Sequence, residues 1–169
     1  MSDRVYNVLF LSARNSARSI LAEGILRKEG HGRFRAFSAG MEPTQVNPLA
    51  LQVLHEADYQ TEGLRPKSRG DFLSADAPAM DFVFTLCDSA GGEVPPRWPG
   101  RPVTADWSIE DPAAAEGGDL DRKAVFIRAH RYLKNRIAAL VALPIASLDE
   151  AALTSQVRGI GQQDARPEA

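Results

Sequence analysis

The sequence predicts one α/β domain built as three layers, with a four-stranded parallel sheet that carries helices on both faces. Four short apolar runs, at 5–11, 33–40, 80–87 and 103–107, have the length of strands, and helical patterns lie among them. Strands that alternate with helices form parallel sheets, because each parallel connection must cross the sheet. A chain of 169 residues holds one substantial core rather than two.

Composition narrows the possible functions. The chain is 44% hydrophobic and 25% charged, with a formal net charge of −2, so no global field favours DNA or a membrane surface. A site for an anion must therefore be local. One cysteine, Cys87, excludes an internal disulfide framework, and three widely spaced histidines give no metal-ligand spacing. We predict neither a metal nor a cofactor, and neither nucleic acid nor membrane as a partner.

The ends of the chain carry no targeting signal that we recognise. The apolar run near the N-terminus is short and follows the charged Asp3 and Arg4, unlike a signal peptide. The apolar stretch AALVALPIA near the C-terminus contains Pro144 and is too short to span a bilayer. These features predict a cytoplasmic protein.

The first half of the chain predicts two strand–helix units. The run 5–11 is short and mostly apolar, as in a strand buried on both faces, and the helix after it presents Ile20, Leu21, Ile25 and Leu26 and stops at Gly30. The run 33–40 alternates with period two, as a strand does. Asn47 and Pro48 then begin a helix over 47–57, since asparagine caps well and proline suits the first turn.

The second half predicts two strands and a long helix. The strand 80–87 is followed by a loop rich in glycine and proline at 88–102, and a short strand covers 103–107. The helix at 120–143 is amphipathic through the following positions: Val125, Phe126, Ala129, Leu133, Ile137, Leu140 and Val141. We divide the chain into a main domain, 1–143, and a C-terminal helical extension and tail, 144–169. Ser147 is the expected cap of a last helix through Val157 and Ile160, with a polar tail from Gly161.

The loop between the first strand and the first helix is the candidate site. It reads SARNSARS from Ser12 to Ser19. Free N–H groups at a helix start favour an anion, and successive N–H groups in a tight turn form a concave nest for oxyanions. Arg18 can grip two oxygens, and Asn15 tolerates a left-handed backbone. The alternative is an ordinary helix capped by Ser16 or Ser19.

These motifs, taken in order, resemble those of the low-molecular-weight tyrosine phosphatases and of the arsenate reductases built on the same fold. That family has Cys, five residues, Arg and Ser, where this chain has Ser12, five residues, Arg18 and Ser19. The resemblance continues through 37–40, 47–54, 81–88 and 106–113 and covers roughly residues 5 to 140. The VFTLCD segment is similar to the arsenate-reductase branch.

The resemblance implies an oxyanion site for arsenate, phosphate or sulfate and a role in arsenic resistance. The expected oxyanion-binding residues are Ser12, Ala13, Arg14, Asn15, Ser16, Ala17, Arg18 and Ser19. The expected catalytic residues are Ser12, Arg18, Cys87 and Asp111. In the family a cysteine thiolate attacks from the first position, whereas the Ser12 hydroxyl is a weak nucleophile without an adjacent base. The anion site can survive this replacement while the chemistry does not.

The arsenate-reductase branch uses three cysteines in relay. Cys87 matches the second of these, and Pro95 stands about where the third is expected. A chain with one cysteine cannot complete an intramolecular thiol–disulfide cycle, so thioredoxin or a glutathione-type reductant is a partner only if thiol chemistry survives. The alternative for Cys87 is a buried core cysteine at the end of a strand.

Asp111 matches the family's acidic residue, which gives a proton to the leaving oxygen. Asp111 followed by Pro112 is also a good helix start, and the two roles are compatible. Glu110 is a second candidate acid. Arg14 either adds to anion affinity or points to solvent, and Trp98 and Trp107 either wall the pocket or pack in surface loops.

Three hypotheses follow. The first is an arsenate-reductase-like protein impaired by Ser12 and by the absent third cysteine, with activity either in a version that has cysteine at position 12 or through an external thiol and Cys87. The second is an oxyanion-binding regulatory pseudoenzyme that kept Arg18 and lost turnover. The third is a tyrosine phosphatase, disfavoured because Ala113 and Ala114 stand where that branch has tyrosines. The sequence leaves open whether the protein is a monomer or a homodimer.

Overall fold

The computed structural model of the chain describes residues 4–74, 76–86, 98 and 100–162. Their elements run as follows: β1 (Tyr6–Ser12), α1 (Arg18–Glu29), β2 (Phe34–Gly40), α2 (Pro48–Glu56), the 3₁₀ helix η1 (Arg69–Phe72), β3 (Phe82–Thr85), β4 (Val103–Asp106), the 3₁₀ helix η2 (Pro112–Ala114), α4 (Asp119–Ala142), the 3₁₀ helix η3 (Ile145–Ser147) and α5 (Glu150–Ile160).

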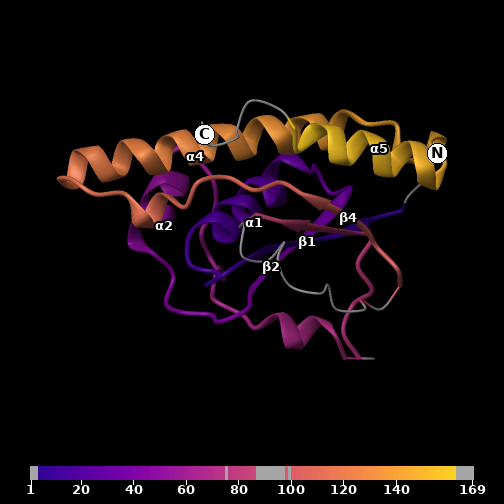
Figure 1. Cartoon of the computed structure of the whole chain (residues 1–169), viewed down its shortest axis with the longest axis horizontal. Helices are drawn as coiled ribbons and strands as arrows, with labels where there is room; N and C mark the ends of the chain where they lie inside the picture. The colour runs from indigo at the N-terminus through magenta and orange to yellow at the C-terminus, as the bar shows by residue number, and fades with distance from the viewer. Residues whose placement is uncertain (1–3, 75, 87–97, 99, 163–169) are drawn as a thin grey trace.

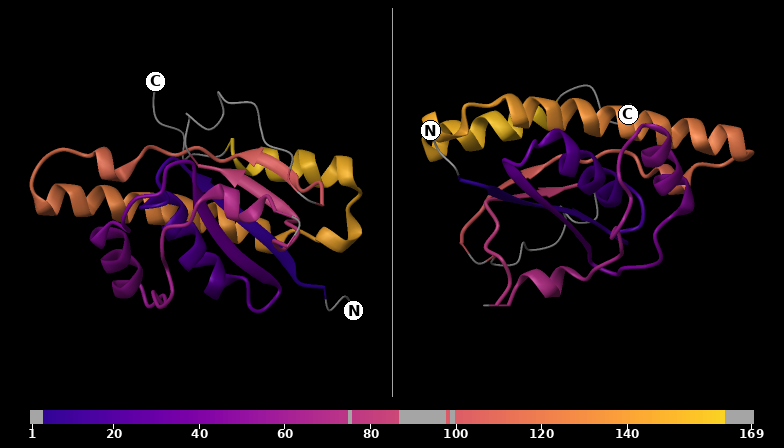
Figure 2. Two further views of the ribbon diagram at one scale, coloured as in Figure 1. Left: turned by 90° about the horizontal axis from the view of Figure 1, so that it is seen from below. Right: turned by 180° about the vertical axis from the view of Figure 1, so that it is seen from behind.

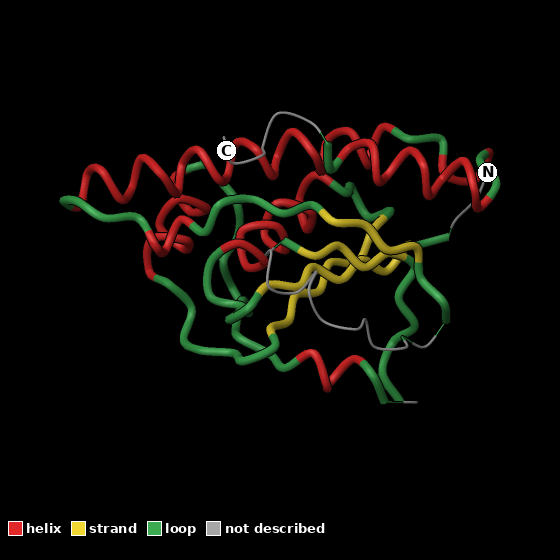
Figure 3. The backbone as a smooth tube through the Cα atoms, in the orientation of Figure 1, coloured by secondary structure: helices red, strands yellow, loops and turns green. Residues whose placement is uncertain are grey.

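The predicted four-stranded parallel sheet is confirmed, with the strand order β2-β1-β3-β4. Figure 1 shows the sheet at the centre, with α4 and α5 along one side and the η1 segment on the other. Figure 3 shows the same layers, with the four strands in yellow beneath the long helices. Because β2 and β3 flank β1 on opposite sides, the connections diverge at the carboxyl end of β1, which is where ligands bind in such sheets.

The side chains of β1 serve the two faces of the sheet in alternation. Val8 and Phe10 lie in the larger core with the helices α1, α2, α4 and α5. Leu9 and Leu11 lie in a second cluster, which Phe72 of η1 and Trp98 help to cover. Both faces are therefore buried, and this explains why residues 8–11 of the strand are all apolar. The view from behind in Figure 2 shows η1 and α4 on opposite sides of the strands.

Helix α1 lies between the sheet and α4 and is buried through most of its length. Residues 19–26 are all buried, including the polar Ser19 and the acidic Glu23. The predicted stop at Gly30 is confirmed. An acidic residue in a helix buried on this scale requires polar partners, and these lie next to the candidate site.

Two local predictions are wrong. Ser147 does not cap the last helix: it ends η3, and Asp149 caps α5 by accepting a hydrogen bond of 2.7 Å from the Ala152 N–H. A carboxylate one residue before the helix satisfies its free N–H groups, so the serine is not needed. The strand β2 does not alternate in burial, because its last three residues, 38–40, are all buried, beside the loop that follows β1.

The C-terminal helix α5 packs against the edge strand β4. Val157 and Ile160 are buried, as predicted, and the Arg158 Nε donates to the Thr104 carbonyl at 3.3 Å. The division of the chain at 143/144 stays a prediction. Among the described helices, none is both long enough and apolar enough to cross a membrane.

Candidate functional site

A cleft of about 620 Å³ opens at the carboxyl end of β1, where the sequence places the site. Three segments line it, and we name them the loop wall (residues 12–18), the middle wall (residues 44–48) and the acidic wall (residues 109–114). The lining residues are Ser12, Ala13, Arg14, Ser16, Ala17, Arg18, Thr44, Gln45, Val46, Asn47, Pro48, Asp111, Ala113 and Ala114. The loop wall and the acidic wall therefore meet at one place, as the parallel sheet predicts.

Four carbonyl groups of the loop wall accept hydrogen bonds from the chain that follows β2. Four backbone hydrogen bonds do this: Met41 N–H to Ser12 O (3.3 Å), Glu42 N–H to Ala13 O (2.9 Å), Thr44 N–H to Arg14 O (2.9 Å) and Asn47 N–H to Ser16 O (2.8 Å). The chain 41–47 therefore holds the loop from Ser12 to Ser16. No motif in the sequence predicts this support.

The N–H groups of the loop wall remain available. Of the N–H groups of residues 13–18, only that of Asn15 donates to another described residue, and its acceptor is the Ser12 hydroxyl at 3.2 Å. Ala17 precedes α1 and provides no side-chain cap, so the alternative in which Ser16 or Ser19 caps the helix is wrong. A loop with unpaired N–H groups at the start of a helix has the geometry of an anion nest.

Asn15 holds the tight turn of the loop. Its φ of 49° is left-handed, as the sequence suggested. Its side-chain Nδ2 donates to Ser19 Oγ at 2.7 Å, and its Oδ1 accepts from the Lys67 N–H at 2.8 Å. Gly40 at the end of β2 allows this packing, because a Cβ there would lie 2.8 Å from the Asn15 nitrogen.

Ser12 is buried beneath the cleft at the last position of β1. Its Oγ lies 2.6 Å from Ser19 Oγ and 3.2 Å from the Asn15 nitrogen that donates to it. Neither of these described partners is a base. His31, His55 and His130 are absent from the residues that line the cleft. Within the described part of the chain, the hydroxyl therefore has no group that would take its proton.

Arg18 connects the two facing walls. Its Nη1 donates to the carbonyls of Leu86 and Ile109, each at 3.2 Å, and its Nη2 lies 3.6 Å from Asp111 Oδ2. Only 11% of its side chain is exposed. Two carbonyl contacts fix the plane of the guanidinium at the edge of the cleft, where it is able to face an anion.

The structure confirms the capping role of Asp111 and places the residue in the lining of the cleft, whereas its role as an acid stays a prediction. Its Oδ1 accepts from the Ala113 N–H at 3.0 Å and caps η2, with Pro112 at the first helical position. Its Oδ2 is the atom that faces Arg18. The cap leaves one carboxylate oxygen in the cleft, so this residue is both structural and placed for acid–base work.

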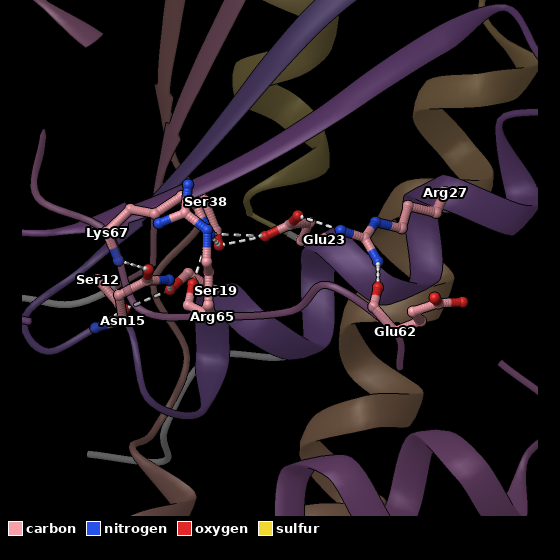
Figure 4. A network of polar contacts seen from close by, with 9 residues as sticks. All are labelled: Ser12, Asn15, Ser19, Glu23, Arg27, Ser38, Glu62, Arg65 and Lys67. Carbon is pink, nitrogen blue, oxygen red and sulfur yellow. Dashed lines mark hydrogen bonds and ion pairs between the residues drawn. The ribbon is translucent and has the colours of Figure 1, made fainter. Parts of the chain in front are cut away.

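A buried polar network lies beneath the loop wall (Figure 4). Glu23 Oε1 accepts from Ser38 Oγ at 2.5 Å and lies 3.4 Å from Lys67 Nζ, while Oε2 accepts from Arg27 at 2.9 Å. Burial lowers the pKa of Lys67, and the carboxylate of Glu23 opposes that shift. Lys67 therefore joins two systems, because its backbone N–H holds Asn15 and its ammonium group faces Glu23.

Sequence reasoning missed Glu23, Ser38 and Lys67. The signal for Glu23 was an acidic residue within the apolar stretch SILAEGIL, at a position that the helix buries. Lys67 carried no comparable signal, since nothing in its neighbourhood predicts that the segment reaches Asn15.

Several other predicted residues lie elsewhere. Glu110 is 67% exposed, lies 3.7 Å from Arg128 and does not line the cleft. Trp107 and Trp98 do not line it either: Trp107 is fully buried in the larger core, and Trp98 belongs to the second cluster. The surface-loop alternative for the tryptophans is therefore wrong, because both are core residues. Arg14 is exposed and lines the cleft.

Cys87 and Pro95 lie outside the described residues, and so does most of the loop 88–102. Within the described part of the chain, no three histidine, cysteine or acidic side chains come together as a metal site.

Comparison with known proteins identifies the family to which this chain belongs. Residues 7–152 match the family described as low molecular weight phosphotyrosine protein phosphatase. A glutaredoxin arsenate reductase of Synechocystis sp. is 32% identical over 135 residues, which cover 80% of this chain and 95% of that protein. An arsenate reductase of Halalkalibacterium halodurans is 34% identical over 130 residues, covering 77% and 91%.

A solved structure described as an arsenate reductase in the phosphate binding state has the same fold. It superposes with a TM-score of 0.68 at 30% identity and covers 82% of this chain and 98% of that one. The chain thus belongs to the low-molecular-weight phosphotyrosine protein phosphatase family, and the relatives described here are arsenate reductases.

Proposed function

We propose that the protein binds a tetrahedral oxyanion of the arsenate and phosphate class in the loop 12–19 and that Ser12 prevents the thiol chemistry of its relatives. The observation that carries this proposal is the orientation of the loop wall. Its carbonyls at Ser12, Ala13, Arg14 and Ser16 accept hydrogen bonds from the chain 41–47, and its N–H groups, apart from that of Asn15, donate to no described residue.

The electrostatics of the cleft support an anion of this size. The N-terminal end of α1 carries a partial positive charge, and Arg18 adds a full one at the facing edge. Asp111 is the acidic residue that lines the cleft, and its ion pair with Arg18 offsets part of its charge. An oxyanion would exchange that pair for closer, charge-assisted hydrogen bonds to the guanidinium.

The same contacts argue against turnover by Ser12. A serine becomes a nucleophile when a neighbouring base takes its proton, and the described partners of Ser12 are the hydroxyl of Ser19 and the N–H of Asn15. A cysteine in this position would ionise near neutral pH, because the helix end and Arg18 stabilise a thiolate. In the proposed function, the protein therefore binds the anion without reacting with it.

Reduction of arsenate by this chain would require an external thiol. The sequence has one cysteine, so no internal disulfide can form and be passed to thioredoxin or a glutathione-type reductant. We therefore expect thioredoxin to support no turnover, and a glutathione-type reductant is a partner only if thiol chemistry survives at Cys87.

Calorimetry tests the binding directly. The unmodified protein should bind phosphate, arsenate and sulfate at one site, and Arg18→Ala should weaken each at least tenfold, because the full positive charge facing the anion is lost. Arg128→Ala is the matched control, since it removes an arginine that is 48% exposed and pairs with Glu110 outside the cleft. Absence of binding by all three anions would overturn the proposal.

A reversion tests the role of Ser12. The protein with Ser12 should show no hydrolysis of a small aryl phosphate, and Ser12→Cys should gain it, because Asp111 already lies in the cleft to protonate the leaving oxygen. Turnover by the Ser12 protein that disappears in Arg18→Ala would contradict the loss of chemistry.

A further inference from the structure

Helix α5 lies almost wholly beyond the part of the chain that matches the family. The match ends at residue 152, whereas α5 continues to Ile160. The helix nevertheless lies on β4, the strand that leads into the acidic wall, and Figure 2 shows it alongside that strand. The contacts of α5 with the residues that follow β4 therefore bear on the position of the acidic wall.

The junction between α5 and the end of β4 depends on Trp107. The indole Nε1 donates a buried hydrogen bond of 2.8 Å to the Val157 carbonyl. Val157 is one of the last four residues of α5, whose carbonyls lack a partner within a regular helix. Gly161 permits the close approach, because a Cβ there would lie 2.3 Å from the Asp106 carbonyl oxygen and 2.7 Å from Trp107 Cδ1.

Trp107 is fixed on its other sides as well. Its ring stacks on Phe84 of β3, with centroids 3.8 Å apart and planes 10° apart. Its carbonyl accepts a hydrogen bond from Arg136 of α4. The residue is fully buried, so α5, α4 and the sheet together define where the chain leaves β4.

The chain that leaves Trp107 enters the acidic wall within two residues. The Ile109 N–H donates to the Leu86 carbonyl at 3.3 Å, and the Ile109 carbonyl accepts from Arg18 at 3.2 Å. Asp111 follows two residues later and faces the same guanidinium. A shift of the chain at Trp107 would therefore displace two of the groups that orient Arg18.

We infer that α5 is a positioning element of the anion site, which acts through Trp107 on the Ile109 carbonyl and Asp111 and so sets the direction of the Arg18 guanidinium. Trp107 is a positioning residue in this account and does not touch the anion. The inference rests on the proposed oxyanion site and adds a role for a helix that lies largely outside the family match.

Phosphate titration of Trp107→Phe tests it. Phenylalanine keeps an aromatic ring against Phe84 and removes the donor to Val157, so we expect phosphate to bind at least fivefold more weakly. Arg158→Ala is the matched control, since it removes a different contact between α5 and β4, at Thr104, away from the acidic wall. That variant should lose stability to urea and keep the phosphate affinity of the unmodified protein.

A double-mutant cycle separates positioning from a general loss of structure. If Trp107 acts through Arg18, Trp107→Phe should have little further effect on phosphate binding in an Arg18→Ala background. A general loosening would instead weaken binding equally in both backgrounds. Gly161→Ala provides a second variant if Trp107→Phe does not fold, because it separates α5 from Asp106 and Trp107 and should weaken phosphate binding in the same way.

The outcomes are distinguishable. Failure of the unmodified protein to bind phosphate would defeat the proposed function itself. Phosphate binding by the unmodified protein that stays unchanged in both Trp107→Phe and Gly161→Ala would overturn the positioning role alone, as would equal weakening in the two backgrounds of the cycle.

Discussion

The loop wall and the acidic wall of the cleft face each other but are held by different means. The loop wall is fixed by four backbone hydrogen bonds to the chain 41–47 and by buried side chains beneath it. The acidic wall contacts the loop wall through the ion pair of Asp111 with Arg18. The side chain of Asp111 is 38% exposed. One wall is built from backbone with buried support, and the other depends on a few side chains.

This difference explains how an anion-binding site can persist when the nucleophile is lost. In the proposed function, the loop wall binds the anion through backbone N–H groups, which every residue except proline supplies, so replacing one side chain leaves them in place. Nucleophilic attack depends on one atom, the one that Ser12 presents as a hydroxyl. We therefore expect variants of the buried support to affect stability and binding together, and variants of the acidic wall to affect binding alone.

Asn15→Ala should have the largest effect. It removes two buried hydrogen bonds and places alanine at a left-handed φ of 49°, so we expect a loss of about 3 kcal/mol of unfolding free energy and at least tenfold weaker phosphate binding. Urea denaturation and calorimetry measure the two quantities. His31→Ala is the matched control, because His31 has the same φ of 49° at an exposed turn and isolates the backbone cost.

Glu23→Gln should have the next largest effect. The change removes a buried charge that faces Lys67 and Arg27, and we expect a loss of about 2–3 kcal/mol in urea denaturation. Phosphate affinity should fall less than threefold, because the amide can still accept from Ser38 and Asn15 keeps its bond to the Lys67 backbone. Glu56→Gln, which breaks an exposed pair with Lys123, should cost less than about 1 kcal/mol. Equal costs for the two variants would be inconsistent with a buried network.

Asp111→Asn should change the phosphate affinity more than the unfolding free energy, which is the opposite of what we expect for Glu23→Gln. Asparagine keeps an oxygen that can cap η2 and removes the charge that faces Arg18, so unfolding free energy should change by less than about 1 kcal/mol. Phosphate should bind several-fold more tightly, because a negative charge leaves the cleft while the Leu86 and Ile109 carbonyls still orient the guanidinium. Glu110→Gln removes a neighbouring charge outside the cleft and should change the phosphate affinity far less. Weaker binding by Asp111→Asn would show that the acidic wall contributes more than charge.

Acidification should have the smallest effect on the unfolding free energy and should leave sulfate binding unchanged. Burial lowers the pKa of His130 on α4 below its ordinary value of 6.5, with Lys134 acting in the same direction and Glu29 against it. The unfolded chain therefore takes up a proton first, and the unfolding free energy falls as the pH drops below about 6.5.

His130→Gln should flatten this acid-side loss of stability. Sulfate, which does not titrate in this range, should bind His130→Gln and the unmodified protein equally at pH 7 and pH 6, because His130 does not line the cleft. A change in sulfate affinity that follows the protonation of His130 would connect α4 to the site.

The sequence was sufficient to predict most of the fold. The mostly apolar runs at β1 and β3 predicted buried strands. Asn47 with Pro48 predicted the start of α2, where the Asn47 side chain accepts from the Leu49 N–H at 2.9 Å. These features depend on local chemistry, which the order of residues records directly. The cap of α5 was misplaced, because Ser147 and Asp149 are both good capping residues and the local pattern does not choose between them.

The candidate site was predicted in part. Arg18, Asp111 and the loop around Asn15 follow from their positions after the carboxyl ends of parallel strands of one sheet. The partners Lys67, Ser38 and the chain 41–47 did not follow, because they reach the loop only through tertiary packing. Trp107 was placed wrongly for the same reason: a tryptophan after a short strand carries no sign that a helix fifty residues later will accept its indole N–H.

The central claim is that the backbone of the loop wall still forms an anion cradle although Ser12 has replaced the nucleophile. Titration of the ¹⁵N-labelled protein with phosphate, followed by NMR, tests this most directly. The account predicts saturable shifts concentrated on the amide resonances of residues 13–19, with the same midpoint for each amide, and their loss in Arg18→Ala. Shifts that do not saturate, or that spread over exposed lysine and arginine positions without favouring this loop, would contradict it.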